Sequence, residues 1–452
     1  MPSKIDLLNN ESLTYEDALQ ETFNVIHCHE ELHAKNAFTA ELSRQRDSIA
    51  ALASHHLGLG TATDAVTVYP PEKWLSGGFN VCVPIDVQLR GGAEKKKLLM
   101  KCPMAFRIAE HKYPGSLDEK LRTEVGAYVW IQESCPSIRI PHLYGFGSSA
   151  HHFTHVSARP WYSRLLHAIR YWLSRRFYGA QPSKYVSTNA SPSLPAHYML
   201  LEFIGPETGR LPAQDWFAKL ADPLCRKRLF TGLSNIILEL AKVPQPKIGS
   251  FRFNNDCTIS LDGRAVFAGT SILEGQGAPR TVPAGQTYTC TEPFVSDMIT
   301  LLDESYRAQI AASDTETACL GQMGTRVFLR AVAHHYIKKQ YRNGPFLMQL
   351  TDLNPGNFFV DDDWKISCLF DLEYISALPV ENLAIPYWLS GGTISDIEGQ
   401  KLAEYEKLRR EFMEILRERE AEYRLAWPIS TIMEEMWTTK GVWFWHSLAS
   451  RY

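Results

Sequence analysis

The stretch LTDLNPGNFFVDDDWKISCLFDLEY, residues 350–374, constrains the fold of this chain more than any other segment. Asp352 is followed five residues later by Asn357 and fourteen residues after that by Asp371. Between them, the apolar runs FFV and ISCLF have the length and composition of buried strands joined by an acidic turn. Pro355-Gly356 supplies a tight turn between Asp352 and Asn357. The hairpin brings Asp371 back towards Asn357, so the sequence predicts that the three polar side chains gather in space.

Side chains of these types at this spacing suit phosphoryl transfer. The reaction needs a carboxylate near the attacking hydroxyl, oxygen ligands for Mg²⁺ and a cation on the nucleotide phosphates. Mg²⁺ prefers hard oxygen ligands and takes only one or two carboxylates from a protein. The alternative is a plain loop and hairpin with acidic turn residues. The spacing favours a metal–nucleotide site.

Composition excludes several other classes of protein. The chain has 452 residues, of which 45% are hydrophobic and 21% charged, as in a globular protein of two or three domains or lobes. A net charge of -3 gives no basic excess for nucleic acid. No apolar run approaches the roughly 18 residues of a membrane span, and the polar N-terminus lacks a signal-peptide core. Nine cysteines without a CxxC pair indicate free thiols, so we expect a soluble cytoplasmic protein.

The residue composition and the hydrophobic pattern change along the chain. Residues 1–72 are rich in helix formers and are expected to be mainly helical. FNVCVPIDVQL, the turn RGGAEKKK and LLMKCPM then form a hairpin signature. A helix is expected over about 117–133, short strands over 140–147 and 197–205, and an insertion over 150–196. After Pro206 the chain is expected to be largely helical except near 345–375. This order indicates a smaller β-rich lobe and a larger α-rich lobe with a ligand cleft between them.

The segment at 350–374 resembles the catalytic and metal loops of the aminoglycoside phosphotransferase and choline kinase family. Within that family, the sequence pattern is most similar to that of fungal-type phosphotransferases. The family pattern is roughly His-Gly-Asp-Leu-His-Pro-Gly-Asn, a hairpin, then Ile-Asp-Trp-Glu. This chain has LTDLNPGN at 350–357 and FDLE at 370–373. The resemblance implies an α+β, bilobal protein-kinase-like fold with a small β-rich N-lobe and a larger, mainly α-helical C-lobe.

The same resemblance implies domain boundaries. They are a helical N-terminal extension at 1–72, a nucleotide-binding N-lobe at 73–205 with the helical insertion 150–196, and an α-helical C-lobe at 206–452 that carries the catalytic and metal loops.

The resemblance also assigns roles to the polar residues of the segment. It implies that Asp352 is the catalytic base and that Asn357 and Asp371 bind Mg²⁺. Glu373 is expected to contact either the substrate or the residues behind the metal. The implied cofactors are ATP or GTP with Mg²⁺, and the implied partner is a small molecule with a hydroxyl group.

The first half of the chain supplies matching candidates for binding the nucleotide. The family places a phosphate-covering loop before its first hairpin, a lysine on the third strand, an acidic partner on the next helix, and backbone contacts to adenine in the hinge. The corresponding residues here are Gly77, Gly78 and Asn80 in the loop, Lys101, Glu124 with Glu119 as runner-up, and Glu202 to Ile204 in the hinge.

The chain departs from the family pattern where Leu350 replaces the usual histidine two residues before the base, and Asn354 replaces the second histidine. Because the base and both metal ligands remain, we favour an active small-molecule O-phosphotransferase. Two alternatives stay open: a catalytically inactive kinase-like binding or scaffold protein, and a kinase-fold enzyme with other chemistry such as nucleotidyl transfer. Tyr387 and Trp388 follow at the place where the family builds its acceptor pocket, so both are candidates for an aromatic substrate wall.

Two further motifs lie outside this pattern. His29-Glu30-Glu31-Leu32-His33 matches the His-Glu-x-x-His pattern of zinc proteases, but so short a pattern also occurs on ordinary polar helix faces, which we favour. Residues 161–179, WYSRLLHAIRYWLSRRFYG, combine an apolar helical stripe with arginines and no acidic residue. We favour a helix that packs on its own domain or docks a partner, and contact with an anionic membrane surface is the alternative.

Overall fold

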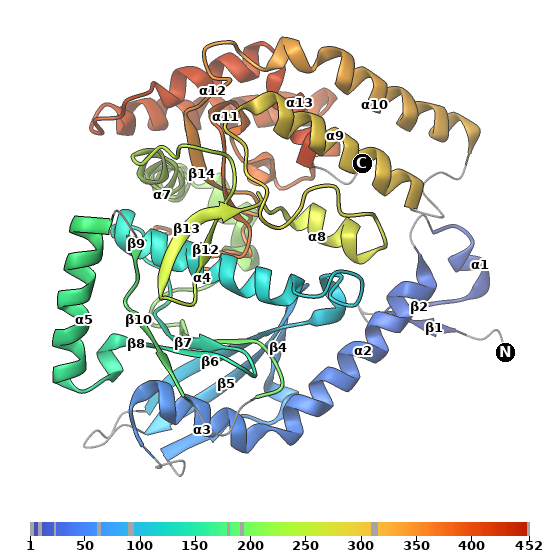
Figure 1. Ribbon diagram of the computed structural model, residues 1–452. Coiled ribbons are helices and arrows are strands. Elements are labelled where there is room, and N and C mark those ends of the chain that lie inside the picture. Colours follow the sequence, from blue (N-terminus) through green and yellow to red (C-terminus); the bar gives the residue numbers. More distant parts are fainter. Residues whose placement is uncertain are drawn as a thin grey trace.

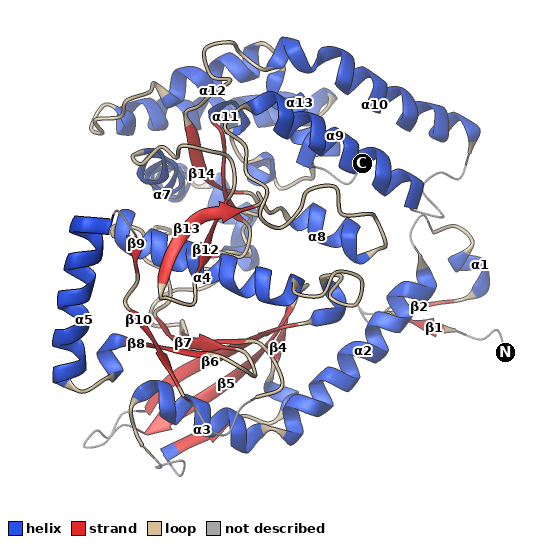
Figure 2. Ribbon diagram, in the orientation of Figure 1, coloured by secondary structure: helices blue, strands red, loops and turns tan. Residues whose placement is uncertain are grey.

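The computed structural model describes residues 4–7, 11–21, 24–60, 65–88, 95–178, 181–189, 194–308 and 315–449. Helices and antiparallel sheets are mixed along the chain, as expected for an α+β protein (Figure 2). The helices are α1 Tyr15–Ala18, α2 Val25–Arg44, α3 Arg46–Leu57, α4 Ser116–Ser134, α5 Trp161–Leu173, α6 Trp216–Ala221, α7 Pro223–Ala241, α8 Ala268–Gly275, α9 Thr291–Ala308, α10 Glu316–Tyr336, α11 Gly399–Glu420, α12 Ile429–Thr438 and α13 Gly441–Ala449.

The largest sheet lies in the first half of the chain and has the strand order β10-β8-β7-β11-β6-β5-β3, with β4 paired to β5. All its pairings are antiparallel. Its strands are β3 Val66–Val68, β4 Leu75–Ser76, β5 Asn80–Gln88, β6 Lys95–Pro103, β7 Leu143–Gly147, β8 His152–His155, β10 Tyr185–Thr188 and β11 Tyr198–Glu202. The predicted hairpin at its centre is confirmed, although β6 begins at Lys95, within the segment predicted as a turn.

The other strands form small sheets. They are β1 Ile5–Asp6 with β2 Ser12–Leu13, β9 Gln181–Pro182 with β12 Ser250–Phe253 and β13 Thr258–Gly263, β14 Phe346–Leu350 with β17 Ile375–Pro379, and β15 Phe358–Val360 with β16 Ile366–Leu369. In Figure 1 the large sheet and α2–α3 occupy the lower half, the C-terminal helices the upper half, and α4 crosses between them.

Strands interrupt two segments that were expected to be mainly helical. Within 206–344, RFNNDCTISL lies in the hairpin β12–β13. The segment 1–72 likewise contains β3, which pairs with β5 and completes the edge of the large sheet.

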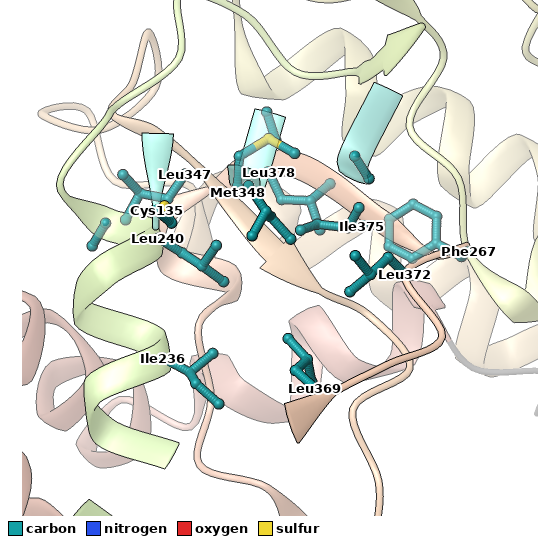
Figure 3. Packing of buried hydrophobic residues seen from close by; sticks show 14 of the residues in the cluster. Cys135, Ile236, Leu240, Phe267, Leu347, Met348, Leu369, Leu372, Ile375 and Leu378 are labelled. Carbon is teal, nitrogen blue, oxygen red and sulfur yellow. The ribbon is translucent and has the colours of Figure 1, made fainter. Parts of the chain in front are cut away.

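Helix α4, predicted over about 117–133, is confirmed and joins the sheet to the rest of the core. Its Trp130 ring stacks on Phe251 of β12 with 5.8 Å between ring centroids. Gly126 permits this approach, because a Cβ there would lie 2.5 Å from the Phe251 carbonyl oxygen. One large apolar cluster continues from α4 through α7 to the C-terminal helices. Figure 3 shows the part of it around Leu240, Met348 and Leu378, beneath the strands that carry the polar loop.

Helix α3 packs against the sheet through a buried histidine. The two ring nitrogens of His56 lie 2.8 Å from Thr154 Oγ1 and 2.8 Å from Tyr198 Oη, on β8 and β11. A Cβ at residue 145 would lie 2.2 Å from His56 Nδ1, so Gly145 on β7 makes room for the ring. Burial lowers the pKa of His56 well below its ordinary value, so the ring is neutral.

Among the described residues, every helix is too short or too polar to cross a lipid bilayer.

Replacement of His56 by alanine removes two buried hydrogen bonds and leaves a cavity between α3 and the sheet. We expect a loss of about 2–4 kcal/mol in the free energy of unfolding, measured by denaturant titration. The matched control is His151→Ala, because His151 is exposed in the turn between β7 and β8 and its loss should cost less than about 0.5 kcal/mol. Equal stability of the two variants would show that His56 does not hold α3 in place.

Candidate active site

The polar loop 351–357 connects β14 to β15 and is held by its own turn. The Asn354 side-chain oxygen accepts from the Gly356 amide at 2.8 Å, and the Asn357 amide donates to the Asn354 carbonyl at 2.9 Å. This arrangement uses the tendency of asparagine to fold back on the backbone two residues later. The predicted Pro-Gly turn therefore forms, and Asn354 stabilises it.

Side chains outside the turn fix the loop to its neighbours. Thr351 donates through both its amide and its hydroxyl to the Tyr374 carbonyl, each at 2.9 Å. The Trp388 indole N–H donates to the Leu353 carbonyl at 2.6 Å. Leu350, which replaces the family's histidine, is the last residue of β14 and packs against the main apolar core. These contacts hold the loop without a histidine.

The structure brings Asp352, Asn357 and Asp371 together. Asn357 Nδ2 donates to the Asp352 carbonyl at 2.6 Å and lies 3.4 Å from its Oδ2. The Phe370 amide donates to the Asn357 carbonyl at 3.0 Å, which places Asp371 directly after the returning strand. Asp371 has a φ of 59°, a left-handed conformation that aspartate tolerates better than most residues. Strained backbone of this kind is frequent at functional sites.

Lys101 on β6 is surrounded by carboxylates from the elements packed against the strand. Its Nζ lies 2.8 Å from Glu124 Oε1 on α4 and 2.6 Å from Asp371 Oδ1. Glu373 Oε2 is 3.6 Å away. Burial lowers the pKa of Lys101, but the three carboxylates outweigh it and raise the pKa well above its ordinary value. The lysine therefore stays protonated.

Glu124 is the acidic residue of α4 that faces Lys101. Its runner-up Glu119 faces elsewhere, because its Oε1 binds Arg264 Nε at 2.9 Å. Glu373 is buried and paired with a second lysine that the sequence analysis missed, Lys120. Lys120 lies one turn before Glu124 on α4, so helical spacing from Glu124 would have indicated it.

Glu373 is held as a carboxylate two residues after Asp371. Asn80 Nδ2 also donates to Glu373 Oε2, at 3.1 Å. Burial raises the pKa of Glu373, but the ammonium groups of Lys101 and Lys120 lower it to about 2. Glu373 therefore positions the lysines.

A cavity of about 690 Å³ collects most of the predicted residues. On the side of the large sheet, the cavity is lined by the Gly77-Gly78 turn and Lys101. On the other side, it is lined by the polar loop 351–357 and by the residues that follow the β15–β16 hairpin. The predicted residues that line it are Gly77, Gly78, Asn80, Lys101, Glu202, Ile204, Asp352, Asn357, Asp371 and Glu373. Glu124 lies behind Lys101, and Tyr387 and Trp388 line a different cavity.

The glycine turn is open on its cavity side and anchored from behind. A Cβ at Gly77 or Gly78 would meet no atom within 4 Å, which leaves room for a ligand over the turn. Arg107 Nε donates to the Gly78 carbonyl at 2.9 Å, and the same guanidinium pairs with Glu31 on α2. Sequence reasoning missed Arg107 and Glu31, because Arg107 lies 29 residues from Gly78 and 76 residues from Glu31 in the sequence.

Glu31 belongs to the His-Glu-x-x-His pattern, which therefore has a structural role. Its histidines are adjacent: His33 Nε2 lies 3.1 Å from His29 Nε2, and His29 Nδ1 lies 2.8 Å from the Asp6 carbonyl. Among the described residues, no group of three or more His, Cys, Asp or Glu side chains is arranged to hold a metal ion. An Mg²⁺ held by one carboxylate, one amide and substrate phosphates needs no such group.

The predicted hinge leaves one backbone donor free. The Glu202 amide donates to the His142 carbonyl at 2.8 Å and the Phe203 amide to the Lys97 carbonyl at 3.3 Å. Within the described part of the chain, the Ile204 amide has no hydrogen-bond acceptor, and it lines the cavity. The Glu202 side chain is engaged with Arg139 at 2.9 Å.

A second cavity, of about 190 Å³, lies on the other side of the polar loop. Thr351 and Leu353, the neighbours of Asp352 in the chain, line it together with Tyr387, and burial together with the Asp352 carboxylate raises the pKa of Tyr387. Trp388 is almost fully buried, so it supports the loop as well as lining the cavity. The remaining lining is mostly apolar or aromatic, with Trp437, Trp443, Trp445 and His446 from the C-terminal helices. It also includes the amides Gln349 and Asn382, and among the described residues no Asp, Glu, Lys or Arg lines it.

No protein-family model matches the chain, and no curated protein matches it in sequence. Among solved structures it is similar to the crystal structure of an aminoglycoside phosphotransferase from Alicyclobacillus acidocaldarius subsp. acidocaldarius DSM 446. The match covers 85% of this chain and 92% of that chain, with 10% identity and a TM-score of 0.25. A similarity this low does not establish a role for any residue. The candidate roles rest on the geometry described above.

Burial, then the charges of Asp371 and Glu373, raises the pKa of Asp352 to about 6. In the metal-free protein we expect its carboxyl carbon to titrate at that pH in an NMR experiment, with the protonated form below the midpoint and the carboxylate above it. Asp371→Asn should lower the midpoint because it removes the strongest neighbouring negative charge. Asp362→Asn, in the exposed turn of the hairpin, should not change it. A midpoint at or below the ordinary ~3.9 would contradict this environment.

Proposed function

We propose that this protein is a phosphotransferase that uses ATP or GTP with Mg²⁺ to phosphorylate a hydroxyl group of a small molecule. The proposal includes a bilobal protein-kinase-like arrangement, with a nucleotide-binding lobe at 73–205, a C-lobe at 206–452 and the extension 1–72. One observation carries it: the polar loop, the returning Asp371 and the buried Lys101–Glu124 pair converge on one cavity under an open glycine turn.

The donor set fits Mg²⁺. Asp371 and Asn357 present a carboxylate and an amide oxygen, both hard ligands, at the wall of the nucleotide cavity. When bound there, the ion would offset the negative charge of the phosphates. The carboxyl groups around Lys101 and Asp352 outnumber the lysines, so the site favours a cation.

The chain's own residues would act as follows. Lys101, positioned by Glu124, binds phosphate oxygens, and the Ile204 amide binds the edge of the base. Asp352 orients the acceptor hydroxyl and takes its proton as the hydroxyl oxygen bonds to the γ-phosphorus and the bond to the nucleoside diphosphate breaks. The glycine turn covers the phosphates and restricts water.

Two alternatives would use the same cavity. An inactive binding or scaffold protein would bind Mg²⁺-nucleotide without turnover. A nucleotidyl transferase would release pyrophosphate instead of a nucleoside diphosphate. Product analysis distinguishes all three.

The second cavity supports a class of acceptor. Among the described residues, no Asp, Glu, Lys or Arg lines it, and burial lowers the pKa of His446, so this ring is neutral near pH 7. A polycation such as an aminoglycoside would lose its hydration there without a carboxylate partner, which is costly. A compact, uncharged hydroxyl compound with an apolar or aromatic body fits this lining.

Substitutions in the loop separate the proposed roles. Asp352→Asn should reduce turnover by about 10²–10⁴-fold while Mg²⁺-nucleotide binding persists, because the base acts only on the acceptor. Asp371→Ala should weaken Mg²⁺-dependent binding as well as turnover. Calorimetric titration with a non-hydrolysable nucleotide, with and without Mg²⁺, is compared with steady-state rates. The matched control, Asp362→Asn, should change neither. Wild-type turnover in Asp352→Asn would show that the base is assigned wrongly.

A screen of hydroxyl compounds with ATP and Mg²⁺, read by mass spectrometry for the gain of one phosphate, tests the acceptor. We expect uncharged aromatic or aliphatic alcohols to be phosphorylated with kcat/KM at least about tenfold above any aminoglycoside, since each unpaired buried charge costs more than 1.4 kcal/mol. Preference for aminoglycosides would place the acceptor outside the second cavity and leave the phosphotransferase proposal intact. Mg²⁺-nucleotide binding without any product, even hydrolysis, would favour the inactive alternative.

A further inference from the structure

Helix α5 turns its apolar face away from the protein. The helix spans 13 residues, Trp161–Leu173, and none of them is buried. Its large apolar residues are exposed, from 38% for Leu173 to 74% for Trp161, and all except Leu173 are at least half exposed. Those residues are Trp161, Tyr162, Leu165, Leu166, Ile169 and Trp172, which form one stripe at helical spacing. Surface helices normally bury such a stripe, so α5 has the opposite orientation.

The opposite face of α5 holds it to the protein through polar contacts. Ser163, His167, Tyr171 and Ser174 are the partly buried positions, again at helical spacing. His167 Nε2 lies 3.0 Å from the Ser183 carbonyl, and Tyr171 Oη donates to Glu133 on α4 at 2.5 Å. The hydrogen bonds fix the direction of the helix, so the exposed stripe is part of the fold.

Basic residues accompany the stripe. Arg164 and Arg170 are exposed on α5, and Arg175 and Arg176 follow in the next turn, Ser174–Tyr178. The sequence from 161 to 178 contains no Asp or Glu. Helix α10 also exposes apolar residues, among them Leu320 and Phe328, but its Arg330 is paired with Asp303. An apolar face beside several arginines, in a segment without acidic residues, therefore distinguishes α5.

We propose that α5 is a membrane-binding element that lies flat on an anionic lipid surface. At about 1.5 Å per residue, 13 residues span roughly 20 Å, too short to cross a bilayer but typical of an interfacial helix. The two tryptophans, tyrosine and aliphatic residues enter the boundary between headgroups and acyl chains, and the arginines contact lipid phosphates. Figure 1 shows α5 along one outer side of the molecule, where a flat surface can reach it.

Charge complementarity selects lipid over a second copy of this chain. A dimer formed through α5 would bring two arginine-rich faces together, since the helix carries no acidic residue to pair with them. An anionic bilayer offers phosphates to those arginines and an apolar layer to the stripe. The proposal is independent of the proposed phosphotransferase activity, because α5 contributes no residue to either cavity.

The test uses the full chain and flotation with vesicles of phosphatidylcholine alone or mixed with phosphatidylserine. We expect binding to the mixed vesicles at low salt, weakened by added salt. Trp161→Ser combined with Leu165→Ser and Ile169→Ser should reduce it at least about tenfold, because three apolar side chains no longer enter the lipid. Arg164→Glu with Arg170→Glu should reduce it by a similar factor on mixed vesicles.

The matched control is Leu320→Ser with Phe328→Ser on α10, which should bind like the wild type. Because all substituted side chains are exposed, thermal unfolding and nucleotide affinity should stay unchanged in every variant. A wild type that ignores mixed vesicles at low salt overturns the proposal, as does equal binding by the α5 variants. A wild-type dimer in sedimentation that the serine variant converts to a monomer would instead assign the stripe to a second copy and also overturn it.

Discussion

The structure depends on a buried cluster of charges around Lys101. A lysine on a central strand is costly to bury, and it is tolerated here because Glu124 and Asp371 contact its ammonium group directly. Lys101 and these two partners come from three separate elements: β6, α4 and the end of the β15–β16 hairpin. The cluster therefore joins the sheet to the half of the chain that carries the polar loop. Removing one partner would leave an unpaired buried charge, so variants of Lys101 must be tested for stability before their activity is interpreted.

The same cluster controls the chemistry of its neighbours. Asp352 lies beside carboxylates that already pair with lysines. Among the described residues, its own carboxylate accepts side-chain hydrogen bonds only from Asn354 and Asn357. Its raised pKa is the consequence. A divalent cation between Asp371 and Asn357 would relieve this excess of negative charge and favour the ionised base. Metal binding and base activation would then be coupled through one electrostatic balance.

The sequence predicted the parts of the site that are local. The five-residue spacing from Asp352 to Asn357 and the hairpin that returns Asp371 are encoded within 25 residues, so turn chemistry and strand length were enough. The prediction of Lys101 depended on the predicted hairpin that contains it. Helical spacing distinguishes Glu124 from Glu119 as the partner of Lys101 only when the direction of α4 is known. Arg107 and Glu31 could not be predicted, because their contacts join residues far apart in sequence. The resemblance placed Trp388 in an acceptor pocket, but only the packing revealed that its indole N–H supports the loop.

Helix α5 shows why amphipathic spacing alone cannot assign a helix to a core or to a surface partner. The stripe from Trp161 to Trp172 is evident in the sequence, and the favoured interpretation was a helix that packs on its own domain or docks a partner. The orientation of α5 is fixed by its other face, where His167 and Tyr171 hydrogen-bond to Ser183 and Glu133. A rotation that buried the stripe would break both hydrogen bonds and leave Glu133 without Tyr171. The polar contacts thus fix an orientation that hydrophobicity alone would disfavour in water, and an exposed apolar stripe of this kind is typical of an interaction surface.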